Sequence, residues 1–301
     1  MDLATLEIFL AVASDRSVTK AAKAIGRVPS NVTTRIQQLE QDLGVALFSR
    51  DGKKMTLTGE GETFLAYANR LTALALEARQ AVRPLTPYGN LCLGTMESTA
   101  ASRLPAPLTQ FNRMWPDVSV RLTMGVSPEL TRSVLAGELD CALIARPPPA
   151  VLAEQRSFSD DLQKLQSELI FVEELVVLLP PGHPDIKSAS DLRVGSLAAL
   201  EPGCTYRRVA EFWARKSSAV KTMEVGSYHT ILASVATGQA AGVMPKSVLE
   251  LMHWPGNARM HDLGPVETFL VSRRGDRASA LDAFHDVLIA TRGKAPHLPP
   301  G

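Results

Sequence analysis

The chain has 301 residues, of which 45% are apolar, and its 32 Lys and Arg nearly balance its 31 Asp and Glu. This composition excludes an intrinsically disordered chain, and no apolar run reaches the roughly 18 residues that span a bilayer. Because the sequence opens without a basic segment, we expect no secretory signal, no membrane partner and a cytoplasmic protein of more than one domain.

A basic segment stands out in this otherwise neutral chain. Eight basic and three acidic residues lie between Arg16 and Lys54. Such a local excess favours a small module that binds nucleic acid. A solvated basic face would carry the same charge, so charge alone leaves both interpretations open.

The first two predicted helices are marked by their ends. Asp2 can cap a helix whose apolar side chains recur every three or four residues. Ser17 can cap a second, short helix over residues 18–25, and Gly26 ends it. Because small Ala side chains lie in the second helix, we expect the two helices to pack closely.

A third predicted helix, which starts at Pro29, has one apolar and one polar face. The apolar face consists of Val32, Ile36, Leu39 and Leu43. Two helices joined by a short turn form a helix-turn-helix, whose second helix enters the major groove of double-stranded DNA. The side chains of this helix that we expect at the DNA are Ser30, Asn31, Thr33, Thr34, Arg35 and Gln38.

Two short strands are predicted next, over residues 47–49 and 54–57, around an Asp51-Gly52 turn. They would complete a winged helix-turn-helix. Basic side chains on such a wing can reach a narrow minor groove, where the potential is most negative. The wing residues expected at the DNA are Arg50, Lys53 and Lys54.

A long helix is predicted from its cap at Thr58 to residue 83. Its apolar side chains have the spacing of a coiled-coil seam. They are Phe64, Ala68, Leu71, Ala75, Ala78 and Val82. Packing on its own domain is one interpretation, but we favour a homodimer seam, because a small winged module has little room to bury so long a stripe.

The first 83 residues resemble the LysR-type transcriptional regulators. The matching stretches are MDLATLEIFLAVA, SVTKAAKAIGRVPSNVTTRIQQLEQDLGVALFSR and LTGEGETFLAYA. Residues that fit the family pattern are Ser17, Ala21, Ala22, Val32, Leu39, Glu40, Leu43, Gly44, Leu47, Phe48, Arg50, Leu57, Thr58 and Gly61, whereas Val28, Pro29, Thr33 and Thr34 depart from it. The resemblance implies a homotetramer, built from dimers, on a DNA operator.

From residue 91 onwards, 21 basic and 22 acidic residues leave no basic excess. Strand-like and helix-like segments alternate there, which predicts a mostly parallel sheet with helices on both faces. The expected strands are 90–96, 118–125, 141–145, 174–180, 221–225 and 240–245. Helices are expected through Leu108 and Phe111, from Pro128 onwards, and over 209–216, 230–238 and 278–291.

This part resembles the LysR effector-binding domain, which is similar to type 2 periplasmic binding proteins. The matching stretches are LPAPLTQFNRMWPDVSVRL, VLAGELDCALI, ELVVLLPPGHP and SVATGQAAGVMP. The resemblance implies two Rossmann-like α/β subdomains, with chain crossings near residues 166–171 and 262–269. The expected domains are 1–58 for DNA binding, 59–90 for the linker helix and hinge, and 91–301 for the effector, with subdomain I at 91–166 and 268–301 and subdomain II at 167–267.

Four strand-to-helix loops could meet between these subdomains, at residues 96–102, 124–129, 201–207 and 225–230. Strand C-termini and helix N-termini at such a cleft favour a small anionic molecule, although plain helix capping is the alternative for any one loop. The expected effector contacts are Ser98, Thr99, Ser127, Thr205, Ser227, Tyr228 and Arg146, the last of which could instead be a surface side chain.

Motifs for catalysis, metal binding and cofactor binding are absent from the sequence, so we expect no enzyme, no metal and no cofactor. Cys204 lies in a cleft loop, which suggests a redox switch. Its possible partners Cys92 and Cys141 lie in strand-like segments of the other subdomain, and a small buried thiol is the alternative.

We therefore expect a ligand-responsive, DNA-binding transcriptional regulator. A small anionic organic effector between the two α/β subdomains would change operator binding. Two alternatives use the same cleft: a solute-binding protein of a transport system, and an enzyme whose catalytic groups lie far apart in the sequence. The basic winged module argues against both.

Overall fold

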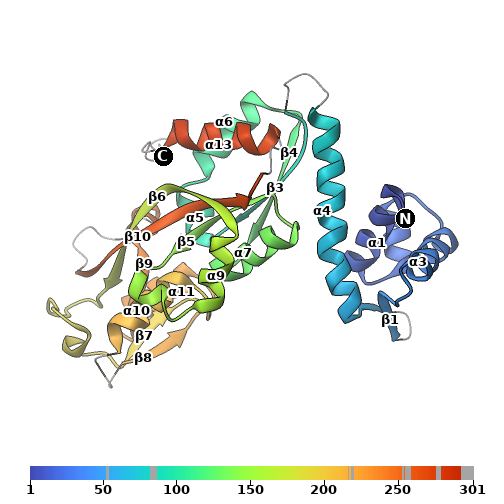
Figure 1. Ribbon diagram of the computed structural model, residues 1–301. Helices are drawn as coiled ribbons and strands as arrows, with labels where there is room; N and C mark the ends of the chain where they lie inside the picture. The colour runs from blue at the N-terminus through green and yellow to red at the C-terminus, as the bar shows by residue number, and fades with distance from the viewer. Residues whose placement is uncertain are drawn as a thin grey trace. The chain divides into compact units, whose positions relative to one another are not determined.

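The computed structural model describes residues 1–51, 54–81, 87–215, 217, 220–252, 254, 259–275 and 279–292. The chain forms two compact units, one built mainly from Met1–Thr86 and the other from Pro87–Leu135 and Leu139–Gly301. The first unit is mostly helical and the second is mixed α/β (Figure 1). No helix in the described ranges combines the length and hydropathy that crossing a membrane requires.

Three helices open the first unit: α1 (Leu3–Asp15), α2 (Val18–Ala24) and α3 (Pro29–Leu43). Both predicted caps are present, because the Asp2 carboxylate accepts a hydrogen bond from the Thr5 amide and the Ser17 hydroxyl accepts one from the Lys20 amide. Helix α2 ends one residue earlier than predicted. The chain leaves the helix there through Gly26, whose φ of +65° suits glycine.

The predicted wing is present as an antiparallel pair, β1 (Phe48–Asp51) and β2 (Lys54–Leu57). The first strand begins one residue after the predicted Leu47. Its start is set by Glu40, whose carboxylate accepts hydrogen bonds from the amides of Leu47 and Phe48 at 2.8 and 3.1 Å. A side chain of α3 thereby ties this helix to the base of the wing.

The winged module has a core of its own. The Phe9 ring packs against Phe48 and Phe64, with ring centroids 5.3 and 5.0 Å apart. The α3 side chains buried in this core, as predicted, are Val32, Ile36 and Leu39. Leu43 was expected on the same face but is 38% exposed, because the helix ends there and Gly44 turns the chain away.

Helix α4 (Gly59–Ala81) is the predicted long helix, but part of its expected seam is internal packing. Phe64 and Ala68 belong to the core of the winged module, so the dimer prediction was wrong for these two positions. The large apolar side chains that α4 exposes are Tyr67 (55%), Leu71 (37%) and Leu74 (59%). Leu71 is one of the expected seam positions, whereas Tyr67 and Leu74 lie next to the seam on the helix surface; Val82 lies outside the described residues.

The second unit contains, within the described residues, an eight-stranded sheet in the order β4-β3-β5-β10-β6-β9-β7-β8. The strands are β3 (Gly89–Thr95), β4 (Val118–Met124), β5 (Cys141–Arg146), β6 (Leu165–Leu178), β7 (Ser196–Ala199), β8 (Lys221–Glu224), β9 (Ala241–Pro245) and β10 (Met260–Arg273). Strands β3, β4 and β5 are parallel to one another, as are β7, β8 and β9. Because β6 and β10 run antiparallel to their neighbours, the sheet is mixed, where a mostly parallel one was predicted.

The two long strands β6 and β10 join the halves of this sheet. The predicted crossings, 166–171 and 262–269, both fall within these strands. Strand β10 pairs with β5 of one half on its other edge, and β6 pairs with β9 of the other half. The predicted strand 174–180 is therefore only the C-terminal part of a longer, shared strand.

Helices cover both halves. They are α5 (Glu97–Ser102), α6 (Pro105–Met114), α7 (Ser127–Ala136), α8 (Pro149–Leu152), α9 (Arg156–Gln163), the 3-10 turn η1 (Ala189–Asp191), α10 (Thr205–Ala214), α11 (Tyr228–Ala236), α12 (Lys246–Leu251) and α13 (Ser279–Thr291). As expected, the last helix returns to the first half, where α13 lies beside α6 (Figure 1). The Phe284 ring of α13 meets the Phe111 ring of α6 edge-on. Strand β7 and helices α8 and α12 were not predicted, because segments of four to six residues are too short to show an apolar period. Helix α9 was overlooked although Phe158 and Leu162 have helical spacing and are buried, and β10 was expected only as a chain crossing.

Two glycines in the first turn of α4 provide a matched test of packing in the winged module. A Cβ at Gly61 would lie 2.1 Å from the Leu47 carbonyl oxygen, whereas one at Gly59 would meet nothing within 4 Å. We expect Gly61→Ala to lower the free energy of unfolding by about 1–3 kcal/mol through overpacking, and Gly59→Ala to leave it unchanged or raise it slightly. Thermal denaturation followed by circular dichroism would measure both; equal melting temperatures would contradict the close approach.

Candidate functional site

The polar face of α3 is open to solvent. Of the residues predicted at the DNA, the structure leaves exposed Ser30, Asn31, Thr34, Gln38 and Lys54. Thr33 is half-buried, and its hydroxyl donates a hydrogen bond to the Pro29 carbonyl at 3.1 Å. The side chain of Arg50 and the whole of Lys53 lie outside the described residues. The described part of the module therefore presents a polar helix face beside a basic wing residue.

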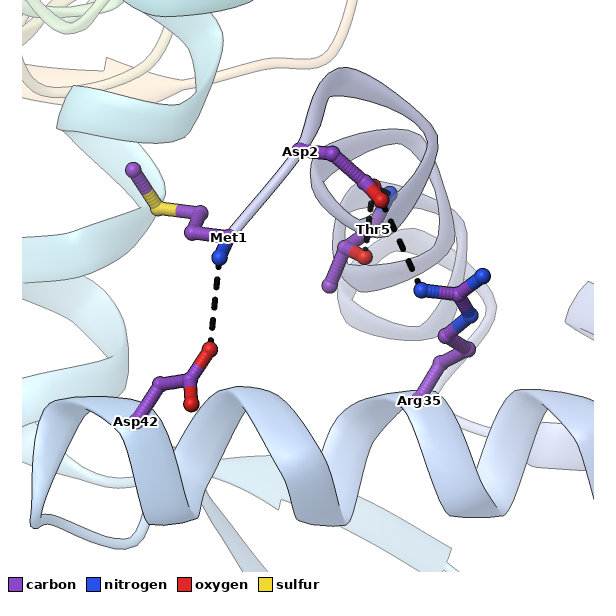
Figure 2. Close-up of polar contacts among 5 residues, drawn as sticks. All are labelled: Met1, Asp2, Thr5, Arg35 and Asp42. Atoms are coloured by element: carbon purple, nitrogen blue, oxygen red, sulfur yellow. Dashed lines mark hydrogen bonds and ion pairs between the residues drawn. The ribbon is translucent and has the colours of Figure 1, made fainter.

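Arg35, the basic residue in the middle of α3, is held beside the start of α1. Figure 2 shows its guanidinium next to Asp2, with the nitrogen and oxygen 3.5 Å apart. Hydrogen bonds from the Thr5 hydroxyl and amide lower the pKa of the Asp2 carboxyl, and Arg35 adds to this shift. The amino group of Met1 likewise lies 3.2 Å from Asp42 of the same helix. Both pairs are solvent-exposed, so a phosphate can replace Asp2 as the partner of Arg35 at small cost.

The second unit has a cavity of about 340 Å³ where the four predicted loops meet. These loops follow β3, β4, β7 and β8, so the carboxyl ends of parallel strands from both halves border it. That is where open α/β sheets bind ligands. Apolar side chains make up much of the lining, among them Met96, Met124, Val126 and Leu200.

The structure brings together four of the seven predicted effector contacts, which line this cavity: Ser98, Ser127, Thr205 and Tyr228. Thr99 is buried but is not part of the lining. The Ser227 hydroxyl caps α11 by accepting a hydrogen bond from the Thr230 amide. Arg146 points elsewhere, with its guanidinium over the Phe269 ring, 3.9 Å from the ring centre.

Two of the lining hydroxyls connect the halves of the domain. The Ser127 hydroxyl of α7 accepts a hydrogen bond from the Ala145 amide at 3.0 Å. The Thr205 hydroxyl of α10 donates to the Ala145 carbonyl at 3.2 Å and lies 3.4 Å from the Ser127 hydroxyl. These contacts across the end of β5 fix the floor of the cavity, and they use much of the hydrogen-bonding capacity of both side chains.

Ser98 and Tyr206 have hydroxyls with unused capacity. They are 2% and 3% exposed and both side chains line the cavity. Neither hydroxyl makes a well-formed hydrogen bond within the described residues, although the Ser98 and Thr268 hydroxyls lie near that of Tyr206 and oppose the rise that burial causes in its pKa. Burial raises the pKa of Tyr206, and the charge of Glu173 adds to the rise, so this hydroxyl remains protonated and can donate. Because buried hydroxyls without partners are uncommon and costly, the pair is suited to a ligand acceptor. Tyr206 was overlooked, although it lies within a loop that the sequence singled out.

Two carboxylates that the sequence analysis did not consider also line the cavity, Glu97 and Glu201. Burial raises the pKa of the Glu97 carboxyl, the neighbouring Glu201 adds to the rise, and His229 opposes it. Within the described residues the cavity lining includes no Lys, Arg or His. The electrostatic character of the lining is therefore acidic, which charge balance over the whole domain does not reveal.

A buried ion pair lies close to Tyr206. Glu173 of β6 is 2% exposed and accepts two hydrogen bonds from the Arg103 guanidinium, at 2.6 and 3.1 Å. The Ser247 hydroxyl of α12 donates a third, at 2.7 Å. Three hydrogen bonds, two of them from a charged guanidinium, offset the cost of removing this carboxylate from water. The ion pair links the end of α5 to β6 and α12, and its carboxylate acts on the cavity residue Tyr206.

Cys204 lines the cavity, and no disulfide joins it to Cys92 or Cys141 within the described residues. Burial raises the pKa of the Cys204 thiol. A raised pKa lowers the thiolate fraction and therefore the reactivity of a cysteine. These observations favour the interpretation of Cys204 as a small packed side chain.

Two family descriptions match the chain. Residues 3–62 match the bacterial regulatory helix-turn-helix protein of the LysR family, and residues 86–292 match the LysR substrate binding domain. Together the two matches cover the winged module and the whole of the mixed sheet.

Among curated proteins, the chain is 31% identical over 292 residues to the HTH-type transcriptional regulator GltR of Bacillus subtilis, which covers 94% of this chain and 95% of that protein. Among solved structures, a full-length OxyR variant from Pseudomonas aeruginosa has a TM-score of 0.72 at 22% identity, covering 100% and 99% of the two chains. CbnR in complex with its target DNA has a TM-score of 0.61 at 23% identity, covering 97% and 100%. The chain therefore belongs to the LysR family of DNA-binding transcriptional regulators, with a helix-turn-helix domain followed by a substrate-binding domain.

Proposed function

We propose that a small anionic organic effector binds in the cavity between the two α/β halves and thereby changes how the protein binds its operator. The observation that carries this proposal is the convergence of four strand-to-helix loops on one cavity, with the free hydroxyls of Ser98 and Tyr206 in its lining. The first residues of α7 and α10, Ser127 and Thr205, both line this cavity, and the backbone N–H groups at such helix ends favour negative charge.

The proposed DNA contacts are those of a winged helix-turn-helix on double-stranded DNA. The exposed polar residues of α3 would read base edges, and Arg35 would exchange Asp2 for a phosphate. The wing would add Lys54 together with Arg50 and Lys53. We propose residues 1–58 as the DNA-binding domain, 59–90 as the linker and 91–301 as the effector domain.

The proposed assembly is a homodimer through α4 and, as the family resemblance implies, a homotetramer. The exposed apolar side chains Tyr67, Leu71 and Leu74 of α4 support this proposal, because their spacing of four and three residues is that of a helix-pair seam. A solute-binding protein with the same cleft is the alternative. It would have no use for the polar face of α3, so sequence-selective DNA binding separates the two functions.

Arg35→Ala is expected to weaken operator binding. Loss of one phosphate contact should reduce affinity about tenfold at low salt and lower the slope of log K against log salt by about 1. Fluorescence anisotropy across a salt series would measure this. Lys221→Ala, on an exposed strand position of the effector domain, is the matched control. An unchanged slope for Arg35→Ala would contradict the contact.

Leu71→Asp is expected to halve the mass of the assembly, because it would bury an unpaired charge in the α4 seam. Sedimentation velocity of the full chain would measure the mass. Leu3→Asp is the control, since Leu3 has the same 37% exposure on a different helix. If the mass of the Leu71 variant is unchanged, this face of α4 is not the dimer contact.

Ser98→Ala is expected to reduce binding of small carboxylates at least fivefold, because it removes a free donor from the cavity. Thr99→Ala is its control, since the Thr99 hydroxyl is also buried without a partner but lies outside the lining. Thermal shift with a panel of mono- and dicarboxylates, followed by calorimetry on those that raise the melting temperature, would compare the two. Equal losses in both variants would point to a general packing effect.

A further inference from the structure

We propose that the effector carries a protonated amine as well as its acid group, and that Glu97 and Glu201 are the counter-charges of this ammonium. The ligand class is therefore a zwitterion such as an α-amino acid, rather than a simple carboxylate. This inference rests on the proposed function and adds the chemical class of the effector to it.

The first observation is the charge of the lining. Glu97 and Glu201 come from two different halves of the domain, one after β3 and the other after β7, and both line the same cavity. No basic side chain lines the cavity within the described ranges, and His229, which influences Glu97, is exposed and outside the lining. A purely anionic ligand would meet two like charges there without a neutralising partner. An ammonium would reduce the repulsion between the two carboxylates on binding.

The second observation is independent of these carboxylates. The side chains of Ser98 and Tyr206 are nearly fully buried and line the cavity, and their neighbouring hydroxyls make no well-formed hydrogen bond among the described residues. Both can donate, Tyr206 in particular because burial keeps it protonated. Two free donors call for an acceptor on the ligand, which the carboxylate of a zwitterion supplies. Donors and acidic groups in one cavity thus match a ligand that has charges of both signs.

The remaining lining restricts the rest of the ligand. Met96, Met124, Val126 and Leu200 are apolar, and the cavity volume of about 340 Å³ lies at the low end of small-molecule sites. The side chain of the effector should therefore be small and mainly apolar. Closure of the two halves would bring Glu97 and Glu201 onto the ammonium together, because each half contributes one of them.

The test uses the full-length protein and three probe series in thermal shift and calorimetry: the twenty L-amino acids, their des-amino acids and their decarboxylated amines. We expect at least one amino acid to raise the melting temperature, and its des-amino acid and amine to bind at least tenfold more weakly. Glu97→Gln and Glu201→Gln, which keep side-chain shape, should each weaken the amino acid at least fivefold and leave the des-amino acid unchanged or tighter. Glu129→Gln, in the first turn of α7 and outside the lining, should have no effect.

The outcomes separate this inference from the proposed function. Des-amino acids that bind as tightly as amino acids, with tighter binding in both Gln variants, would overturn the ammonium site and leave an anionic effector in place. Amines that bind as tightly as amino acids would overturn the acid group. If no probe shifts the melting temperature, the proposal of a zwitterionic effector is wrong. The proposed DNA contact is tested separately, by the Arg35→Ala measurement.

Discussion

The antiparallel pairing of β6 with β10 is the constraint on which the effector domain depends. Both strands have 14 residues, and they pair along almost their whole length. On its other edge, β10 pairs antiparallel with β5, which belongs to the parallel strands of one half. Strand β6 likewise pairs antiparallel with β9, which belongs to the parallel strands of the other half. The parallel strands of both halves therefore end at a common place, and the loops after β3, β4, β7 and β8 meet there. The cavity is a consequence of this arrangement.

Polar contacts then fix the two halves where the strands alone do not. On the floor of the cavity, Ser127 and Thr205 share the backbone of Ala145. Close to Tyr206, Glu173 of the shared strand β6 is held by Arg103 and Ser247. A buried carboxylate is tolerated only with such partners, and removal of one leaves an uncompensated charge. These residues keep the cavity lining in place and leave Ser98 and Tyr206 free for a ligand.

The winged module depends on different physics, the packing of three aromatic rings from three elements. Phe64 of α4 takes part in that packing, which explains why the apolar stripe of this helix serves two purposes. Its first residues close the core of the module. Leu71, further along the same stripe, and its neighbours Tyr67 and Leu74 remain exposed. Because a helix has 3.6 residues per turn, the buried and the exposed apolar side chains of α4 lie close together on its surface. The spacing of apolar residues in the sequence therefore does not show which of them face the core of the module.

The sequence by itself determined where helices start and end and that strands and helices alternate, because these features depend on residues close together in the chain. Asp2 and Ser17 mark helix starts, Gly26 and Gly44 mark helix ends, and the alternation of strands and helices defines a two-half α/β domain with four candidate loops. Tertiary structure decided which faces are buried and which loop residues reach the cavity. Thr99, Ser227 and Arg146 satisfied the same local pattern as Ser98. In the structure, however, Thr99 lies outside the cavity lining, Ser227 caps a helix and Arg146 stacks on Phe269. The acidic lining was overlooked, although Glu97 and Glu201 lie in two of the four loops that the sequence singled out. The choice of hydroxyl-bearing residues passed over these carboxylates, and only the tertiary structure decides which side chains of a loop line the cavity.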